Sequence, residues 1–343
     1  MRFHITFLST YFPEQDGSLD VYYQHVLEQM QLAEEVGIDC WWFTEHHFIG
    51  YGGVVPNPAV MMALAAGRTS CLRLGSAISI LPLHHPIQVA EDYAMVDVAS
   101  AGRLEFGIGR GNTAFDYTGY GIPQEESRGR FEEATDIITK LWTHDRVSHE
   151  GTYWQFPELA LFPRPVQQPH PPIWVAGTSV ESLGWAGQRG YSIMTVPHVR
   201  TPEQVRPGME AWQEGLRAGG HDPAMRHCKA HLRVWVDERA DRAREVAEAG
   251  ITRYDTINRL GRGGNPAFVT AVDPGYDWAG MRAMGRNIYG NPDEVIRGIE
   301  TAARNYGVDT LGAQFNFGGI PHAEVMKAMR LFGKEVMPAF QPA

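Results

Sequence analysis

The sequence predicts an α/β protein folded as a single closed (β/α)8 barrel. Strand-like and helix-like segments alternate along its 343 residues, and a helix–glycine–strand junction recurs at Gly37, Gly190 and Gly307. Eight strand candidates can be counted. Parallel strands need helical crossovers, and closing eight of them into a barrel removes the unpaired edges. An open, doubly wound sheet is the alternative fold.

The strand candidates are short apolar or alternating runs between turn residues. Between the first two, residues 19–36 carry apolar side chains at helical spacing, and Gly37 follows as a stop signal. The eight candidates lie near residues 2–8, 39–44, 72–80, 104–109, 173–177, 191–196, 230–236 and 310–316.

Two stretches exceed a simple strand–helix repeat. Residues 144–172 are rich in proline and aromatic residues and predict a hairpin with an extended lead into the fifth strand. Residues 255–290 are rich in glycine, and we expect a mobile lid over the barrel mouth there. Asn291–Glu294 then has the pattern of a capped helix start. With these insertions, residues 1–343 are expected to form one domain.

Composition restricts the class of protein. Apolar residues make up 43%, and the formal charge of −10 argues against a nucleic-acid partner or an anionic membrane surface. The three cysteines fit neither a disulfide framework nor a zinc site. No signal peptide and no apolar run of membrane-spanning length is apparent. A cytoplasmic protein without a metal is the expectation.

In a barrel of this kind the functional residues lie where strands end. The second strand ends in Glu45-His46-His47, and alternation lets only one of the two histidines face the barrel mouth. A histidine there could act as acid, base or hydrogen-bond donor, or it could be a packed polar residue. His84 and His85 after the third strand are interpreted as a helix-entry feature.

The next two strand ends could bind an anion together. Arg110 stands between glycines, including Gly109, that let a backbone approach a flat ligand, and it could clamp a phosphate. After the fifth strand, small and hydroxyl residues precede a helix, which offers amides to an anion. A plain turn and ordinary capping by Ser179 are the alternatives. The residues of this second segment are Gly177, Thr178, Ser179 and Ser182.

With these residues in view, the chain resembles the bacterial luciferase-like flavin-dependent monooxygenases over nearly its whole length. The Glu-His-His-Phe block and the Val-Met-Pro ending are similar to the luciferase α-subunit. The matching blocks include Thr44–Phe48, Pro56–Pro58, Ile80–Pro82, Gly102–Gly111, Pro171–Gly177, Gly290–Val295 and Leu331–Pro338.

The resemblance implies a (β/α)8 barrel that binds reduced FMN at its C-terminal face. The active-site histidine of the family matches His46, and its phosphate-binding arginine matches Arg110. Its phosphate loop matches Gly177, Thr178, Ser179 and Ser182, with one residue inserted, so which hydroxyl contacts phosphate stays open. A cis peptide under the flavin falls at Ala77-Ile78, and Gly109 replaces a reactive cysteine of the luciferase α-subunit.

The activity implied is that of a two-component monooxygenase. A separate NAD(P)H:flavin reductase supplies FMNH2, and dioxygen adds to it to give a flavin hydroperoxide that oxygenates a small organic substrate. Alternatives are a deazaflavin-dependent oxidoreductase on the same fold and a non-catalytic flavin-binding subunit. A homodimer is expected from the family. The substrate is not implied, although an aromatic pocket could draw on Trp41, Trp42, Phe48, Tyr51 and Tyr117.

Overall fold

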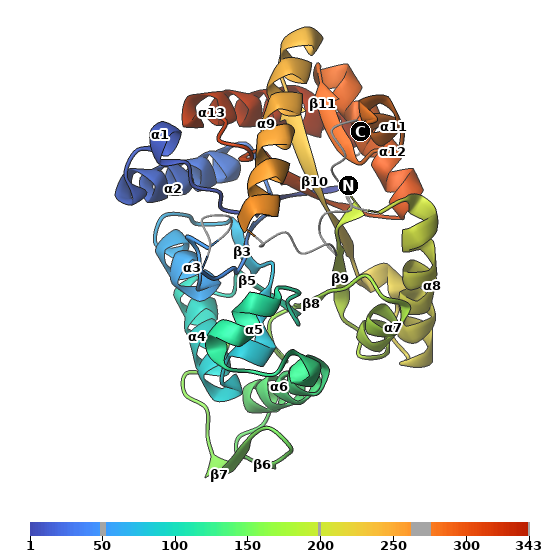
Figure 1. The fold of residues 1–343 in the computed structure, drawn as a ribbon. Coiled ribbons are helices and arrows are strands. Elements are labelled where there is room, and N and C mark those ends of the chain that lie inside the picture. Colours follow the sequence, from blue (N-terminus) through green and yellow to red (C-terminus); the bar gives the residue numbers. More distant parts are fainter. Residues whose placement is uncertain (49–52, 198–199, 262–275, 342–343) are drawn as a thin grey trace.

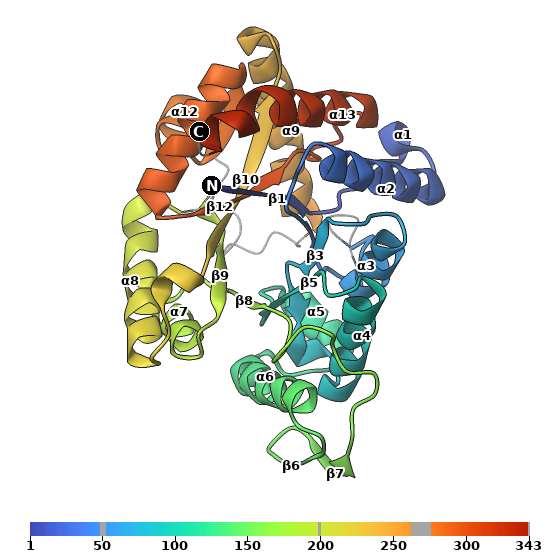
Figure 2. The same cartoon turned by 180° about the vertical axis from the view of Figure 1, so that it is seen from behind.

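The computed structural model describes residues 1–48, 53–197, 200–261 and 276–341, and it confirms the closed parallel barrel. The strands surround the barrel axis and the helices lie outside them, as the front and rear views show (Figures 1 and 2). All eight predicted strands are present. They are β1 (Arg2–Phe7), β2 (Cys40–Phe43), β3 (Arg73–Ser76) with β4 (Ser79–Ile80), β5 (Leu104–Gly109), β8 (Ile173–Ala176), β9 (Ser192–Thr195), β10 (Cys228–Val236) and β12 (Thr310–Gln314).

The barrel closes through the long strand β10. Its residues 228–230 pair with β9, and its residues 229–233 pair with β12, which returns to β1. Its last residues, 233–236, pair with an additional strand, β11 (Asn287–Gly290). The sequence did not predict β11, because residues 255–290 were interpreted as one long loop.

That interpretation is therefore wrong at both ends of the stretch. Residues 255–261 complete helix α9, and the short helix α11 precedes β11. The middle of the predicted lid, residues 262–275, lies outside the described residues. The helix start expected at Asn291 is confirmed, since Asn291 and Glu294 form a reciprocal capping box.

The helices mostly follow the strands in alternation. They are α1 (Pro13–Asp16), α2 (Leu19–Glu35), α3 (Pro58–Ala66), α4 (Pro86–Ala99), α5 (Ala114–Tyr120), α6 (Ser127–Thr143), α7 (Val180–Gln188), α8 (Pro202–Ala218), α9 (Ala240–Gly261), α11 (Trp278–Ala283), α12 (Pro292–Tyr306) and α13 (His322–Leu331). None of the described helices combines the length and the apolar character needed to cross a membrane.

The third predicted strand, residues 72–80, is divided in two. The Ala77-Ile78 peptide bond is cis, as the resemblance implied, and it separates β3 from β4. The predicted hairpin is also present: β6 (Val147–Glu150) and β7 (Gln155–Leu159) pair antiparallel and extend away from the barrel (Figure 1).

Alternation along β2 divides the buried side chains between two layers. Trp41 and Phe43 pack in the outer core between strands and helices, whereas Trp42 packs inside the barrel with Trp174 and Met194. Successive side chains of a strand point to opposite faces. Burial of each of these large side chains stabilises the folded state by about 1.5–3 kcal/mol. Turning β2 over would lose this burial on both faces, so the alternation fixes which face of the strand points into the barrel.

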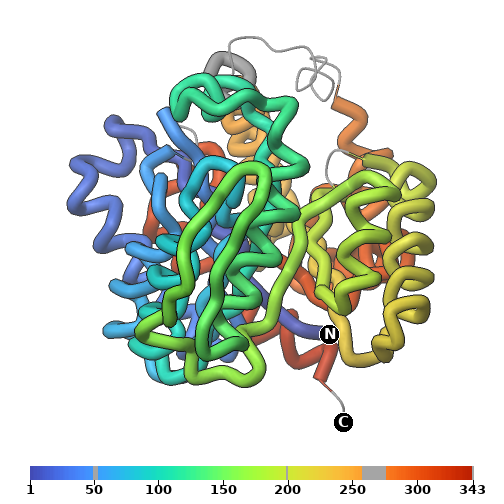
Figure 3. The backbone as a smooth tube through the Cα atoms, turned by 90° about the horizontal axis from the view of Figure 1, so that it is seen from below, coloured from blue at the N-terminus to red at the C-terminus, as the bar shows by residue number. Residues whose placement is uncertain are grey.

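The two ends of the described chain meet at one end of the barrel (Figure 3). The ring of Phe3, in the first strand, packs edge-on against Phe340, with centroids 5.5 Å apart. Because β1 begins there, this is the N-terminal end of the barrel, opposite to the strand ends that carry the predicted site.

Candidate functional site

The structure brings the two predicted anion-binding segments together. Arg110, directly after β5, and Ser182, in the first turn of α7, line one pocket. The pocket lies where β5 and β8 run side by side, since Gly107 pairs with Trp174. Strand order alone predicted that these two segments are neighbours, and this part of the interpretation is confirmed. The remaining lining residues are Arg128, Phe131, Glu132, Val175, Ala176 and Trp185.

Arg128 is a second cation in this pocket that the sequence analysis missed. It stands in the first turn of α6, where the helix dipole disfavours a positive charge. An arginine in the first turn of a helix needs an anionic partner. This position was therefore the sequence signal from which Arg128 could have been predicted as part of an anion site. In the structure Arg128 pairs with Glu132 at 2.9 Å and with the exposed Glu181 at 2.5 Å.

The hydroxyl residues before α7 cap the helix. The Ser179 hydroxyl accepts a hydrogen bond from the Ser182 backbone N–H at 3.1 Å and lies 2.9 Å from the Ser182 hydroxyl. Thr178 accepts a hydrogen bond from Arg200 at 3.2 Å. Gly177 lies at the end of β8, next to Leu183. The segment thus combines a helix N-terminus with guanidinium groups, which is a favourable environment for an anion.

Gly109 lies at a crowded place in the barrel wall. A Cβ atom at Gly109 would lie 2.3 Å from Cδ1 of Ile78, and one at Gly107 would lie 1.8 Å from the backbone oxygen of Ser76. The glycines of β5 therefore let β3, β4 and the Ala77-Ile78 peptide approach closely. In the structure the side chain of Ile78 fills the space beside Gly109.

The two histidines after β2 face different surroundings. His47 is buried against Glu45, two residues before it, whereas His46 is half-buried. If the alternation of β2 continued past its last residue, Phe43, His46 would lie on the same face as Trp42, which is inside the barrel. The structure thus separates a buried His47 from a more exposed His46, and a role for His46 at the barrel mouth stays a prediction.

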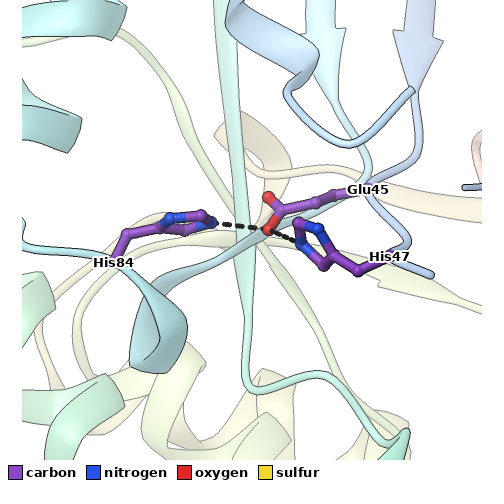
Figure 4. Close-up of side chains that lie close together, drawn as sticks. All are labelled: Glu45, His47 and His84. Carbon is purple, nitrogen blue, oxygen red and sulfur yellow. Dashed lines mark hydrogen bonds and ion pairs between the residues drawn. The ribbon is translucent and has the colours of Figure 1, made fainter. Parts of the chain in front are cut away.

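Glu45 joins two histidines in one buried cluster (Figure 4). Its Oε1 atom lies 2.9 Å from Nε2 of His47 and 2.6 Å from Nε2 of His84, and its Oε2 accepts the backbone N–H of Ile80. Burial opposes ionisation of Glu45, but the hydrogen bonds from His47 and His84 outweigh it and lower the carboxyl pKa. His84 therefore does more than begin a helix, whereas its neighbour His85 does cap α4.

A buried lysine lies on the inner face of the barrel at the start of β10. The Nζ atom of Lys229 is 3.9 Å from the ring centre of Trp42 and 3.3 Å from the hydroxyl of Thr6. Burial lowers the pKa of this ammonium group to about 7, although the nearby Glu105 favours its charged form. The interior of the barrel therefore holds a titratable amine packed against Trp42.

Most of the predicted pocket aromatics belong to the core. Trp41, Trp42 and Tyr117 are almost completely buried, in agreement with the packing alternative. Phe48 is 65% exposed. Tyr51 lies outside the described residues.

Comparison with known proteins assigns this barrel to a family. The model for luciferase-like monooxygenases matches residues 1–310. The chain is 28% identical over 352 residues to the alkanal monooxygenase alpha chain of the Kryptophanaron alfredi symbiont, covering 97% of this chain and 96% of the relative. The crystal structure of monooxygenase RslO1 from Streptomyces bottropensis aligns with a TM-score of 0.89 and 30% identity, covering 99% of this chain and 100% of that one.

The protein therefore belongs to the luciferase-like monooxygenase family and is a flavin-dependent monooxygenase. The oxygenase component of the flavin-dependent trigonelline monooxygenase of Acinetobacter baylyi is 37% identical over 185 residues, covering 53% of this chain and 51% of that one. At lower identity the fold alone is shared. One such structure is the FMN complex of the oxygenating constituent of 3,6-diketocamphane monooxygenase from Pseudomonas putida, with 23% identity, 99% coverage of both chains and a TM-score of 0.83. Another is an F420-dependent secondary alcohol dehydrogenase, with 18% identity, 99% coverage of both chains and a TM-score of 0.77.

Proposed function

We propose that this chain is the oxygenase component of a two-component monooxygenase that uses FMNH2 from a separate NAD(P)H:flavin reductase. FMNH2, dioxygen and substrate would be converted to FMN, oxygenated substrate and water. The observation that carries the proposal is the pocket in which Arg110 and Arg128 meet the first turn of α7. A reductase partner is also favoured by the relative whose name describes it as an oxygenase component.

The residues of this pocket fit the phosphate of FMN. Two guanidinium groups and a helix N-terminus face the same space, and each favours a dianion. Arg128 can exchange its partner Glu181 for the phosphate. The side chain of Glu181 is 73% exposed, and surface ion pairs contribute little stability. We assign the phosphate to Arg110, Arg128, Ser182 and the neighbouring backbone of Gly177–Ser179.

The flavin ring would extend from this pocket toward the barrel mouth. Ile78 and Gly109, which touch one another, would then support one side of the ring, and His46 would face it from the end of β2. When bound, FMNH2 would supply the redox chemistry. The chain's own contribution is to orient the ring, exclude water and hold or move a proton at the imidazole of His46.

Anaerobic binding with two reduced cofactors tests the proposal. We expect reduced FMN to bind more tightly than the reduced deazaflavin F420, and admission of air to yield oxygenated product in the presence of a substrate. Tight binding of the deazaflavin with hydride transfer would instead support the oxidoreductase alternative. Flavin binding without turnover of any oxidisable substrate would support a non-catalytic subunit.

We also propose a homodimer formed through α3 and α4. These helices pack beside one another and expose four apolar side chains on their outer surface: Val60, Leu64, Met95 and Val98, with exposed fractions of 44–58%. Apolar side chains gathered on adjacent helices are typical of a subunit interface. An isologous dimer would cover both copies of this surface.

A further inference from the structure

Glu45, His47 and His84 bring a carboxylate and two imidazoles together in one cluster at the end of β2. One carboxylate oxygen, Oε1 of Glu45, faces Nε2 of both histidines at 2.9 and 2.6 Å. The three potential ligand atoms lie within 4.8 Å of one another. Within the described part of the chain this is the one group of three or more such side chains that could hold a metal ion.

The distances are close to those of a tetrahedral metal site. Bonds of about 2.0–2.1 Å from a zinc ion to nitrogen and oxygen hold neighbouring ligand atoms roughly 3.3 Å apart. The two oxygen–nitrogen separations, 2.9 and 2.6 Å, would have to open by less than about 1 Å to admit the ion, and the two nitrogen atoms already lie within 4.8 Å of one another. Figure 4 shows the imidazoles of His84 and His47 approaching the same carboxylate oxygen of Glu45 from different sides.

The surroundings also orient the ligands. Nδ1 of His47 lies 3.2 Å from the hydroxyl of Tyr120, which fixes this ring and leaves Nε2 directed at the cluster. The other carboxylate oxygen of Glu45 is held by the backbone N–H of Ile80 at 3.0 Å. Metal-binding histidines ordinarily make such a second contact through the nitrogen that does not bind the metal.

Charge and access are compatible with a divalent cation. Glu45 supplies one negative charge within the cluster, and Asp92 acts electrostatically on His84 from α4 as a second one. The side chain of His84 is 27% exposed, whereas Glu45 and His47 are buried. An ion and one water ligand could therefore enter from the side of His84.

We propose that Glu45, His47 and His84 form a binding site for one divalent first-row transition-metal ion, such as Zn²⁺. Imidazole is a borderline ligand that suits zinc, cobalt or nickel, and two histidines with one carboxylate are a known zinc ligand set, whereas magnesium and calcium prefer more oxygen ligands. The ion would join the end of β2 to the segment 80–84, and Tyr120 would link it to α5. It is a structural site, and it does not depend on the proposed flavin chemistry.

Cobalt binding to tag-free protein tests this site. The protein is stripped with a chelator and titrated with Co²⁺ and with Zn²⁺, with calorimetry for stoichiometry and visible absorption for coordination. We expect one ion per chain, a visible cobalt band typical of low coordination number, and a higher Tm with Zn²⁺. His84→Ala is expected to weaken binding at least tenfold, because it removes a ligand at the partly exposed side.

The matched control is His85→Ala, since His85 neighbours His84 but caps α4 instead of facing Glu45. This variant should bind the ion as the unmodified chain does. Glu45→Gln, checked for native circular dichroism, should also lose binding while leaving anaerobic FMNH2 binding measurable. The proposal is overturned if no stoichiometric ion binds, or if His84→Ala and His85→Ala bind it equally.

Discussion

The Oε2 atom of Glu45 accepts a 3.0 Å hydrogen bond from the backbone N–H of Ile80. This contact ties the residue before His46 to β4, the strand that follows the Ala77-Ile78 peptide. The proposed proton-handling residue and the proposed support of the flavin ring are therefore held in one fixed relationship. Hydrogen bonds to charged groups contribute about 1.5–3 kcal/mol, so the contact can maintain that arrangement.

Replacing His46 tests its proposed role. We expect His46→Ala to lower the rate of substrate oxygenation by about 100-fold or more, in the range usual for a lost general acid or base. Anaerobic FMNH2 binding should change little, because the phosphate contacts remain. The measurement is product formation in single turnover beside flavin binding. His85→Ala is the control, and an unchanged rate in His46→Ala would refute the role.

Arg110 is expected to recognise the phosphate and not the flavin ring. Arg110→Ala should weaken FMN binding by about 10-fold or more, as expected for the loss of a charge-assisted contact, and should leave riboflavin binding nearly unchanged. Fluorescence titration with both flavins measures the difference. Arg189→Ala, at the far end of α7, is the matched control. Equal losses for FMN and riboflavin would argue against a phosphate contact.

Lys229 is expected to make stability depend on pH. Its pKa of about 7 in the folded chain is below the ordinary value of 10.5, so the folded state binds fewer protons than the unfolded state between these two values. The free energy of unfolding contributed by this residue therefore rises with pH from about 7 to about 10.5. Below about pH 7 the full cost of burying the charge remains.

A comparison of Lys229→Met with the unmodified chain measures this effect. The variant should gain most in stability below about pH 7, and the gain should shrink as the pH rises toward 10.5. Each unit of pKa shift corresponds to about 1.4 kcal/mol. Denaturant unfolding at several pH values is the measurement, with Lys327→Met at an exposed position as control. A difference that does not vary with pH would contradict the assignment.

Charging the outer surface of α3 and α4 tests the proposed dimer. Leu64→Glu and Met95→Glu should each convert the dimer to a monomer, because a buried, unpaired carboxylate opposes association. Light scattering after size exclusion measures the mass. Met225→Glu adds the same charge at a 66% exposed methionine outside these helices and should leave the mass unchanged. A native chain that is already monomeric would exclude the proposal.

Local sequence patterns determined the barrel and the approximate place of its site. Strand and helix periodicity is encoded by neighbouring residues, so the eight strands and the helix start at Asn291 could be predicted directly. Arg110 and Ser182 could be placed together because strand order in a parallel barrel follows the chain. The strand β11 was missed because it stands at the end of the glycine-rich stretch 255–290, which was interpreted as one loop, and because it pairs with the last residues of β10, 233–236, outside the regular strand–helix repeat.

Tertiary structure alone decided which side chains meet across segments. The sequence by itself determined that a histidine and an arginine follow particular strands, since that is a matter of local order. It could not show that Arg128 completes the pocket, that Ile78 fills the space beside Gly109, or that Glu45 joins His47 to His84. Such contacts depend on distances between chain segments, which are set only when the strands close and pack.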